Sequence, residues 1–280
     1  MIISSPKSGV IMQIIDLNDE NKHLYFVCLE DWSDEMKEAG NHKELWYNKM
    51  KDRGLRVKFA ADDAGVIGGM IHYLPIEHSI VEGKDLYFIN CIWVHGYKEG
   101  RGNFLKQGMG KALLTAAEDD ARELGARGIA AWGISLPFWM RAAWFKKQGY
   151  QKVDNLQGQV LLWKPFANDA EAPSWIRPKA DLDFGLEPDK VVINAFKNGW
   201  CPAQNLLFER VKRAAADYPD DVVFREVDTF EKKSISEYGL TDAMFINKRA
   251  VRNGPPVSYK KIQNILKKNV KRLHKNIGKS

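Results

Sequence analysis

The chain has 280 residues, of which 45% are hydrophobic and 28% charged, and its formal net charge is +6. This composition is that of an ordinary soluble protein, and the length predicts two domains rather than one. No apolar run approaches the length that spans a bilayer, and the start of the chain lacks a secretory core, so we expect no membrane contact. The three cysteines (Cys28, Cys91 and Cys201) are scattered and odd in number. This excludes a disulfide framework or a cysteine metal cluster and predicts a cytoplasmic protein.

The charge is unevenly distributed along the chain. Residues 190–280 hold 19 Lys and Arg against 9 Asp and Glu, whereas residues 1–189 hold 23 against 27. This difference predicts a boundary between two halves. A basic half could bind nucleic acid or an acidic protein. The aromatic residues that a single-strand binder places among its cations are few there, so we do not expect a nucleic-acid partner.

In chain order, the first part predicts a mixture of strands and helices, as expected of an α/β (α+β) domain. The predicted elements are a strand at 12–17, helices at 18–39 and 42–51, strands at 55–60, 66–73 and 86–94, a helix at 110–124, a strand at 128–135, a helix at 138–148, and strands at 151–153 and 159–164. Residues 167–189 contain several prolines and no amphipathic period, which predicts a linker.

A glycine-rich, basic stretch connects the apolar strand 86–94 to the helix 110–124. It contains Gly100, Gly102, Gly108 and Gly110 together with several cations. A strand, a glycine loop and a helix N-terminus together can hold a phosphate, because glycines let the backbone approach and the first N–H groups of the helix point at the anion. The spacing fits neither the dinucleotide fingerprint G-x-G-x-x-G nor the nucleotide loop G-x-x-x-x-G-K-[ST].

The sequence Gly108-Met109-Gly110 followed by Lys111 resembles the second half of the pyrophosphate loop R/Q-x-x-G-x-G/A, which is typical of the GNAT superfamily of N-acetyltransferases. The usual Arg or Gln is replaced by Leu105. A second match to this superfamily is Ala142 to Tyr150, which resembles its late helix and strand. The resemblance covers residues 12–166 and implies a mixed sheet with a splayed central cleft, in a domain that we place at residues 1–166.

The resemblance also implies acetyl-CoA as co-substrate. The pantothenyl arm would pair with the backbone of the fourth strand of the family fold, a form of strand addition. In this sequence the matching residues are Ile92, Trp93 and Val94. The pyrophosphate would be held by the loop residues Lys106, Gln107, Gly108, Met109, Gly110 and Lys111.

The catalytic groups are less well defined by the sequence. Acetyl transfer needs a deprotonated amine, donors for the developing oxyanion and an acid for the leaving thiolate. Many members of the superfamily carry a Tyr on the late helix as this acid and an Asn seven positions earlier, but the matching positions are Phe145 and Phe138. The alternatives for the acid are Tyr73, Tyr87, Cys91 or solvent. The candidates for the base are Glu77, His78 and His95.

Two further residues are predicted to contact the acceptor. Asn90 shares a face of its strand with Ile92 and is placed to orient a substrate. Trp132 belongs to a group of tryptophans around the cleft-forming elements, where an aromatic wall can attract a cationic amine. We expect the acceptor to be a small-molecule or peptide amine.

Residues 190–280 predict a second, smaller α/β domain. The expected elements are strands at 190–196, 222–227 and 244–246 and helices at 204–216 and 260–273. The turn Trp200-Cys201-Pro202 after the first strand resembles the thioredoxin-like fold, and the whole run resembles the YoaP-like domain found behind acetyltransferase domains. Gln204 replaces the second cysteine of C-x-x-C, so a monothiol role for Cys201 and a role in docking a protein partner both stay open.

The sequence therefore predicts a two-domain N-acetyltransferase with an appended monothiol module. The rival interpretation is an acyl-CoA-binding protein without catalytic activity, in which Phe145 reflects lost chemistry and the second domain binds a partner. No metal is expected.

Overall fold

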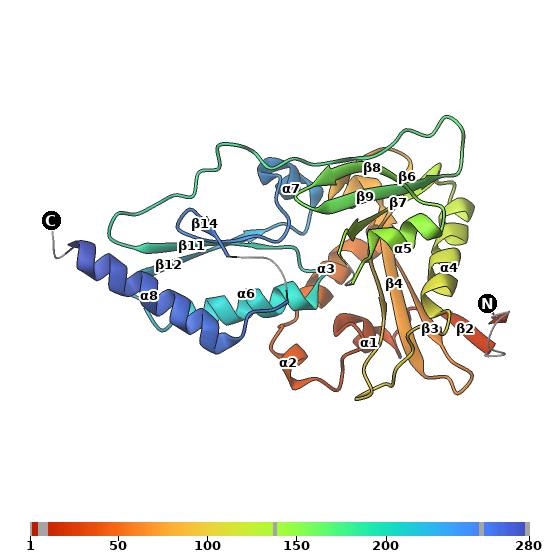
Figure 1. Cartoon of the computed structure of the whole chain (residues 1–280), viewed down its shortest axis with the longest axis horizontal. Helices are drawn as coiled ribbons and strands as arrows, with labels where there is room; N and C mark the ends of the chain where they lie inside the picture. Colours follow the sequence, from red (N-terminus) through yellow and green to blue (C-terminus); the bar gives the residue numbers. More distant parts are fainter. Residues whose placement is uncertain (1, 5–10, 137–138, 252–254, 278–280) are drawn as a thin grey trace. The chain divides into compact units, whose positions relative to one another are not determined.

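The computed structural model describes residues 2–4, 11–136, 139–251 and 255–277 (Figure 1). The chain forms two compact units, each made of two segments. The first unit comprises Met1–Ser33 and Tyr47–Ile176, and the second comprises Asp34–Trp46 and Arg177–Ser280. The domain limits at 166 and 190 stay a prediction.

The first unit is built on an eight-stranded mixed sheet with the strand order β1-β2-β3-β4-β6-β7-β9-β8. Only β6 and β7 are parallel; every other neighbouring pair is antiparallel. This confirms the predicted α/β fold with a mixed sheet. The strands are β1 (Ile2–Ser4), β2 (Ile11–Asp16), β3 (Arg56–Ala61), β4 (Ile67–Pro75), β6 (Leu86–Val94), β7 (Gly128–Ile134), β8 (Gln151–Leu156) and β9 (Gln159–Pro165).

The helix α4 (Met109–Glu123) follows β6 and packs on this sheet. Its apolar residues recur at the helical period, so Leu113, Ala117 and Ala121 are buried while Lys111 and Thr115 are exposed. The shorter helix α5 (Ala142–Lys147) contacts β7 and β9. The predicted start of α5 at Phe138 lies outside the described residues.

The helix predicted at 18–39 is wrong as one continuous helix, because the helical backbone breaks after Phe26. Helix α1 (Lys22–Phe26) ends after five residues, and Cys28 and Leu29 follow with φ of 51° and 65°. Non-glycine residues seldom adopt such left-handed angles, and the burial of Leu29 holds the turn in place. The chain then enters the second unit through α2 (Asp34–Lys37), and α3 (His42–Met50) leads back to the first.

A small two-stranded sheet joins residues from the predicted linker to the first unit. Strand β10 (Ser174–Trp175) pairs with β5 (Val81–Glu82), and the backbone N–H of Trp175 donates to Asp154 Oδ2 over 2.9 Å. The Trp175 side chain is buried. Two short 3-10 turns, Lys51–Arg53 and Ile76–His78, complete the first unit.

The second unit has a four-stranded sheet of order β12-β11-β13-β14, in which only β11 and β12 are parallel. Its elements are β11 (Val191–Lys197), α6 (Pro202–Ala215), β12 (Val222–Asp228), α7 (Lys232–Tyr238), β13 (Met244–Ile246), β14 (Arg249–Ala250) and α8 (Tyr259–Ile277). Residues of α6 and α8 form one apolar core with the sheet. Within the described residues, no helix is both long and apolar enough to cross a membrane.

Candidate active site

Strands β6 and β7 separate halfway along their length. Their parallel pairing runs from Leu86 and Gly128 to Ile89 and Ala131 and then stops. Beyond this point β6 continues to Val94, paired with β4 alone, while β7 continues to Ile134, paired with β9. The backbone groups of β6 that would face β7 are therefore left without a strand partner. We call residues 90–94 of β6 and 132–134 of β7 the splay.

Asn90 lies where the two strands part. His72 pairs with Cys91 and Tyr73 pairs with Ile89, so Asn90 is the extra residue of a β-bulge. Its backbone carbonyl accepts a hydrogen bond of 2.8 Å from Trp132 Nε1, which reaches across from β7. Its side chain is only 2% exposed, and among the described residues Oδ1 has no hydrogen-bond partner. A buried oxygen without a donor is costly and is a natural contact for a ligand.

The glycine loop leads from the open end of β6 to α4. Gly108 precedes the helix with φ of 96°, and Lys106 has φ of 61°. The first N–H groups of α4 have no partner within the helix, and the helix dipole favours an anion there. Met109 is buried and anchors the turn, whereas Lys106 and Lys111 are exposed. The loop residues predicted to hold pyrophosphate therefore combine unpaired donors with two cations.

Two side chains of the loop make hydrogen bonds within the protein that hold the loop in place. Gln107 Nε2 donates to the carbonyl of Asn103 over 2.8 Å, so this side chain turns back on its own loop. Arg101 Nε donates to Asp31 Oδ1 over 2.9 Å, and its Nη1 donates to the carbonyl of Ile67. The predicted role of Gln107 in pyrophosphate binding thus rests on its backbone.

His95 braces the loop and is not placed to act as a base. It is fully buried; Nδ1 lies 2.7 Å from the carbonyl of Gly102, and Trp32 Nε1 donates to its Nε2 over 3.0 Å. A carbonyl can only accept, so Nδ1 carries the proton and Nε2 is the acceptor, which fixes the neutral tautomer. Both ring nitrogens are occupied. The sequence missed Trp32, because nothing at position 32 indicates a partner 63 residues away.

The late helix contributes packing to the same region. A Cβ added at Gly110 would lie 3.5 Å from the ring of Trp144 on α5, an ordinary van der Waals contact. Phe145, at the position of the expected tyrosine, is fully buried against Trp144 and Tyr150. The matching residue Phe138 lies outside the described residues.

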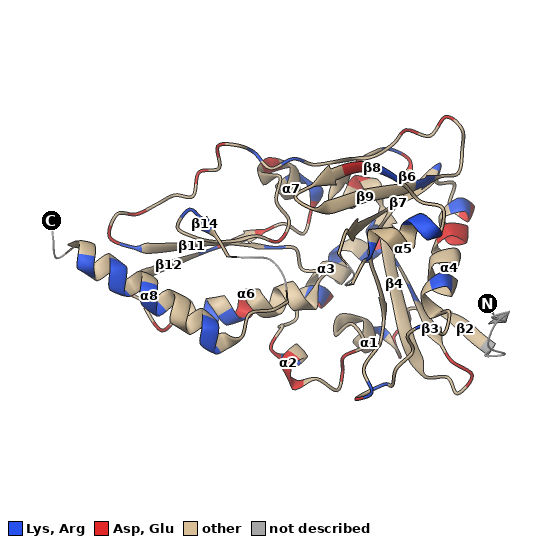
Figure 2. Ribbon diagram, in the orientation of Figure 1, with Lys and Arg blue, Asp and Glu red and all other residues tan. Residues whose placement is uncertain are grey.

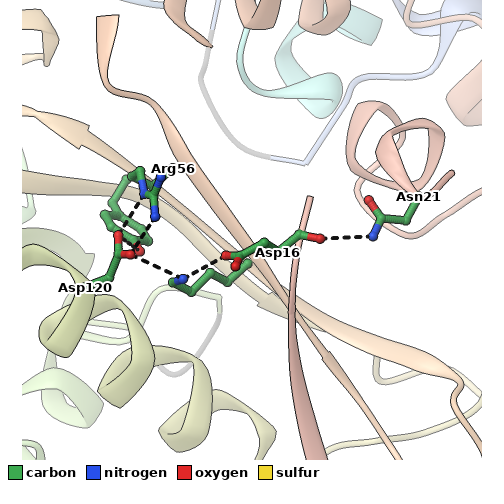
Figure 3. A network of polar contacts seen from close by, with 6 residues as sticks. Asp16, Asn21, Arg56 and Asp120 are labelled. Carbon is green, nitrogen blue, oxygen red and sulfur yellow. Dashed lines mark hydrogen bonds and ion pairs between the residues drawn. The ribbon is translucent and has the colours of Figure 1, made fainter. Parts of the chain in front are cut away.

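Tyr73 and Tyr87 lie where β6 is still paired with β7, outside the splay. Tyr73 donates its hydroxyl proton to Asp120 Oδ2 over 2.7 Å, and Arg56 makes two further bonds of 2.8 and 2.6 Å to this carboxylate (Figure 3). Lys58 Nζ lies between Asp120 Oδ1 at 3.4 Å and Asp16 Oδ1 at 2.8 Å. This network connects β2, β3 and β4 to α4. Its groups bond to one another, so its geometry indicates a role in holding the fold together rather than in catalysis.

The network shifts the pKa of its members in opposite directions. Burial disfavours the charged form of Asp120, but hydrogen bonds from Arg56 and Tyr73 outweigh it and hold the carboxyl pKa below its ordinary value. Burial, and then the hydrogen bond to Asp120, raise the pKa of Tyr73. A tyrosine held in this way keeps its proton at neutral pH, and that proton points at Asp120 rather than at the splay.

Glu77 and His78 lie in the 3-10 turn that follows β4. Because β4 and β6 are antiparallel, this turn is beside the start of β6, at the opposite end from the glycine loop. Glu77 Oε1 accepts the backbone N–H of Asp85. The structure therefore does not bring the two predicted bases together with the loop residues.

Cys201 belongs to the second unit, where it precedes α6 as its N-cap residue and is partly buried. Its backbone N–H donates to Asn198 Oδ1 over 3.3 Å. A thiol at a helix N-terminus fits the monothiol role, which stays a prediction. Within the described ranges, no three His, Cys, Asp or Glu side chains are grouped as a metal site would need.

Residues 16–150 match the model of the Acetyltransferase (GNAT) family. Solved structures that match part of the chain include an acetyltransferase of the GNAT family from Staphylococcus aureus (15% identity, TM-score 0.40, 55% of this chain and 98% of that chain). Others are the PaiA N-acetyltransferase from Thermoplasma acidophilum in complex with coenzyme A (14%, 0.41, 55% and 99%) and a GNAT acetyltransferase from Brucella melitensis in complex with acetyl-CoA (15%, 0.37, 59% and 95%). No curated protein matches the chain. The family match ends before the second unit's main segment, whose thioredoxin-like and YoaP-like character stays a prediction.

Proposed function

We propose that the chain transfers an acetyl group from acetyl-CoA to an amine, because residues 16–150 match the model of the Acetyltransferase (GNAT) family. The observation that carries this proposal is the splay of β6 from β7, which opens beside the N-terminus of α4. A linear amide-containing arm can pair with a free strand edge while its anionic end rests on a helix N-terminus.

The cofactor would lie along β6 and the glycine loop. The backbone of Ile92, Trp93 and Val94 offers N–H and C=O groups to the amides of the pantetheine arm. The N–H groups at Gly108, Met109 and Gly110 would receive the pyrophosphate. Lys106 and Lys111 are exposed on either side of this turn and supply positive charge.

The acceptor would be oriented at the bulge. The unpartnered Oδ1 of Asn90 can accept an N–H of the amine, and Trp132 fixes the backbone at the same residue. The neutral amine attacks the thioester carbonyl, the C–S bond breaks, and the thiolate takes up one proton while the amine nitrogen loses one. Phe145 has no proton to give and the Tyr73 hydroxyl is bonded to Asp120, so Tyr87, Cys91 and solvent stay open as the source of the thiolate's proton.

Calorimetry with acetyl-CoA tests the cofactor site. Gly108→Asp adds a carboxylate to the loop and an unfavourable side chain at a positive φ, so we expect binding to be lost. Gly125→Asp is the matched control, because Gly125 follows the other end of α4 with φ of 81° and open space around it. Equal affinity of the wild-type protein and Gly108→Asp, with both folded, would contradict the proposal.

The second candidate is an acyl-CoA-binding protein without transferase activity, and the observation in its favour is Phe145. Release of coenzyme A from acetyl-CoA, measured with a thiol reagent across a panel of amines, separates the two functions. Binding of acetyl-CoA with no amine-dependent release would favour the second candidate.

A further inference from the structure

The closing helix α8 has two opposite faces. Its buried residues Ile262, Leu266, Val270 and Leu273 recur every three or four positions and lie in the apolar core of the second unit. At 100° per residue these four side chains span about 80° of the helix surface. The apolar stripe of α8 is therefore already covered by its own unit.

The other face of α8 is cationic. Seven side chains on it are exposed, namely Lys260, Lys261, Lys267, Lys268, Lys271, Arg272 and Lys275. By the same geometry they fall within an arc of about 140° centred opposite the apolar stripe, in a row about 22 Å long. We call these seven residues the basic face; they appear as blue segments along α8 in Figure 2.

Nothing nearby on the helix neutralises the basic face. The helix has no Asp or Glu. In the part of the chain that the structure describes, none of the seven cations is in an ion pair; the one ion pair of α8 there is between His274 and Asp221. The only uncharged residue within the arc is Asn264. A row of unpaired cations creates a strong local potential for a polyanion.

The residues of the basic face, and what the rest of α8 contacts, indicate which class of polyanion this face can bind. A membrane-surface helix inserts its apolar stripe into the bilayer, and here that stripe is in the core. A single-strand binder stacks bases on aromatic side chains, and the only Phe, Trp or Tyr of α8 is Tyr259, whose ring is covered by Arg213 at 3.9 Å. A protein interface needs buried aromatic or apolar anchors, which the basic face lacks.

We propose that the basic face binds the phosphate backbone of a duplex nucleic acid. The scarcity of aromatic residues, which in the sequence argues against a nucleic-acid partner, applies to single strands and not to a duplex. A duplex needs no unstacked base, and its phosphates repeat about every 3.4 Å of rise along each strand, so the row of cations matches about six base pairs. Long lysine side chains can follow this spacing without reading the sequence. The function is separate from acetyl transfer and lies on the second unit.

Fluorescence anisotropy of a labelled 20-base-pair duplex with the full chain tests this proposal. We expect wild-type binding in the micromolar range at about 50 mM salt, weakening steeply as salt rises. The triple change Lys267→Gln, Lys271→Gln and Lys275→Gln removes three cations that lie one turn apart on exposed positions. It should lower the affinity at least tenfold and reduce the slope of log affinity against log salt by about 2.7, since each lost phosphate contact contributes about 0.9.

The matched control is Lys84→Gln, Lys152→Gln and Lys179→Gln, which removes the same charge from exposed positions elsewhere. It should keep the affinity within about twofold of wild type, since the loss is local rather than a matter of net charge. Equal loss in the two triple variants, or absence of wild-type binding at 50 mM salt, overturns the proposal. So does tighter binding to polyglutamate or to anionic vesicles than to the duplex. Circular dichroism confirms that α8 is retained in each variant.

Discussion

At the scale of single residues, the partners of a side chain decide its chemistry more than its type does. His95 has the right type for a base, but both of its ring nitrogens are occupied by Gly102 and Trp32. Asn90 has no acid–base chemistry, yet its buried, unpartnered oxygen makes it the stronger candidate for contact with the acceptor.

Asn90 gives a prediction in which stability and activity move in opposite directions. Asn90→Leu replaces a buried oxygen that lacks a donor with an apolar group of similar size. We expect the free energy of unfolding to stay equal or to rise by about 1 kcal/mol, because the cost of the unpaired oxygen disappears. We expect amine-dependent turnover to fall at least tenfold with acetyl-CoA affinity unchanged. Urea unfolding, calorimetry and the thiol-release assay measure the three quantities, and unchanged turnover would exclude Asn90 from the acceptor site.

Asp120 gives a prediction about pH. Its folded-state pKa is lowered, so its contribution to stability is present above the unfolded pKa of about 3.9 and is lost as pH falls through the folded value. Asp120→Asn should therefore destabilise the protein by about 2 kcal/mol at pH 7, since Arg56 and Lys58 lose their anion. The difference from wild type should shrink below about pH 4. Unfolding curves at pH 7 and pH 3.5 check this, and a difference that grows in acid would show that the sign is wrong.

At the scale of elements, the loop 95–108 depends on contacts from outside its own sequence. Gly100 has φ of 71°, and a Cβ built there would lie 2.1 Å from the Trp32 ring. The ring thus lies directly on the backbone of the loop, and the same tryptophan donates to His95. Trp32 therefore holds the glycine loop at two residues, His95 and Gly100, before the chain reaches α4.

Gly100→Ala tests this bracing. We expect the added methyl group to displace Trp32 or the loop, to accelerate amide exchange across residues 96–104, and to weaken acetyl-CoA binding several-fold. Gly65→Ala is the matched control, since Gly65 has a similar φ of 79° with open space around it and carries only the backbone strain. Hydrogen exchange by mass spectrometry compares the two, and similar exchange of the loop in both variants would show that Trp32 does not hold it.

The periodicity of apolar residues predicted the long helices and strands well, but it did not predict where a helix is interrupted. Helix α4 and strand β6 were expected from their apolar patterns and agree within a residue or two with the structure. The helix predicted to Ala39 failed because propensity does not register the turn at Cys28 and Leu29, which the burial of Leu29 imposes from the tertiary structure. For the site, the glycine loop followed from local sequence, whereas the contact of Trp32 with His95 depends on residues 63 positions apart.

At the scale of the whole molecule, the chain crosses between the two units three times, after Ser33, after Trp46 and after Ile176. Residues 34–46 therefore find their partners in the second unit. Arg210, whose side chain is 6% exposed, donates to Glu35 Oε1 over 2.5 Å and to Glu38 Oε2 over 3.5 Å. His42 makes a further bond to Glu209.

A fragment ending at Ile176 tests how far the first unit stands alone. We expect residues 1–176 to fold and to bind acetyl-CoA, because the sheet, the loop and β10 are all present. Residues 34–46 should exchange their amides faster than in the full chain, since Arg210 and Glu209 are missing. Calorimetry and hydrogen exchange check both points. An insoluble fragment, or one without acetyl-CoA affinity, would show that the first unit needs the second.

The split second unit also imposes an order of events during synthesis. Glu35 leaves the ribosome 175 residues before Arg210, an interval of roughly 9–35 s at about 5–20 residues per second. Throughout that interval the nascent chain displays Glu35, Glu38 and His42 without the residues that will bind them. The sheet of the first unit can form without residues 34–46. The contacts between α2 and α6 can form only after α6 has been synthesised. Translation speed between codons 47 and 210 is thus a variable in the folding of this protein.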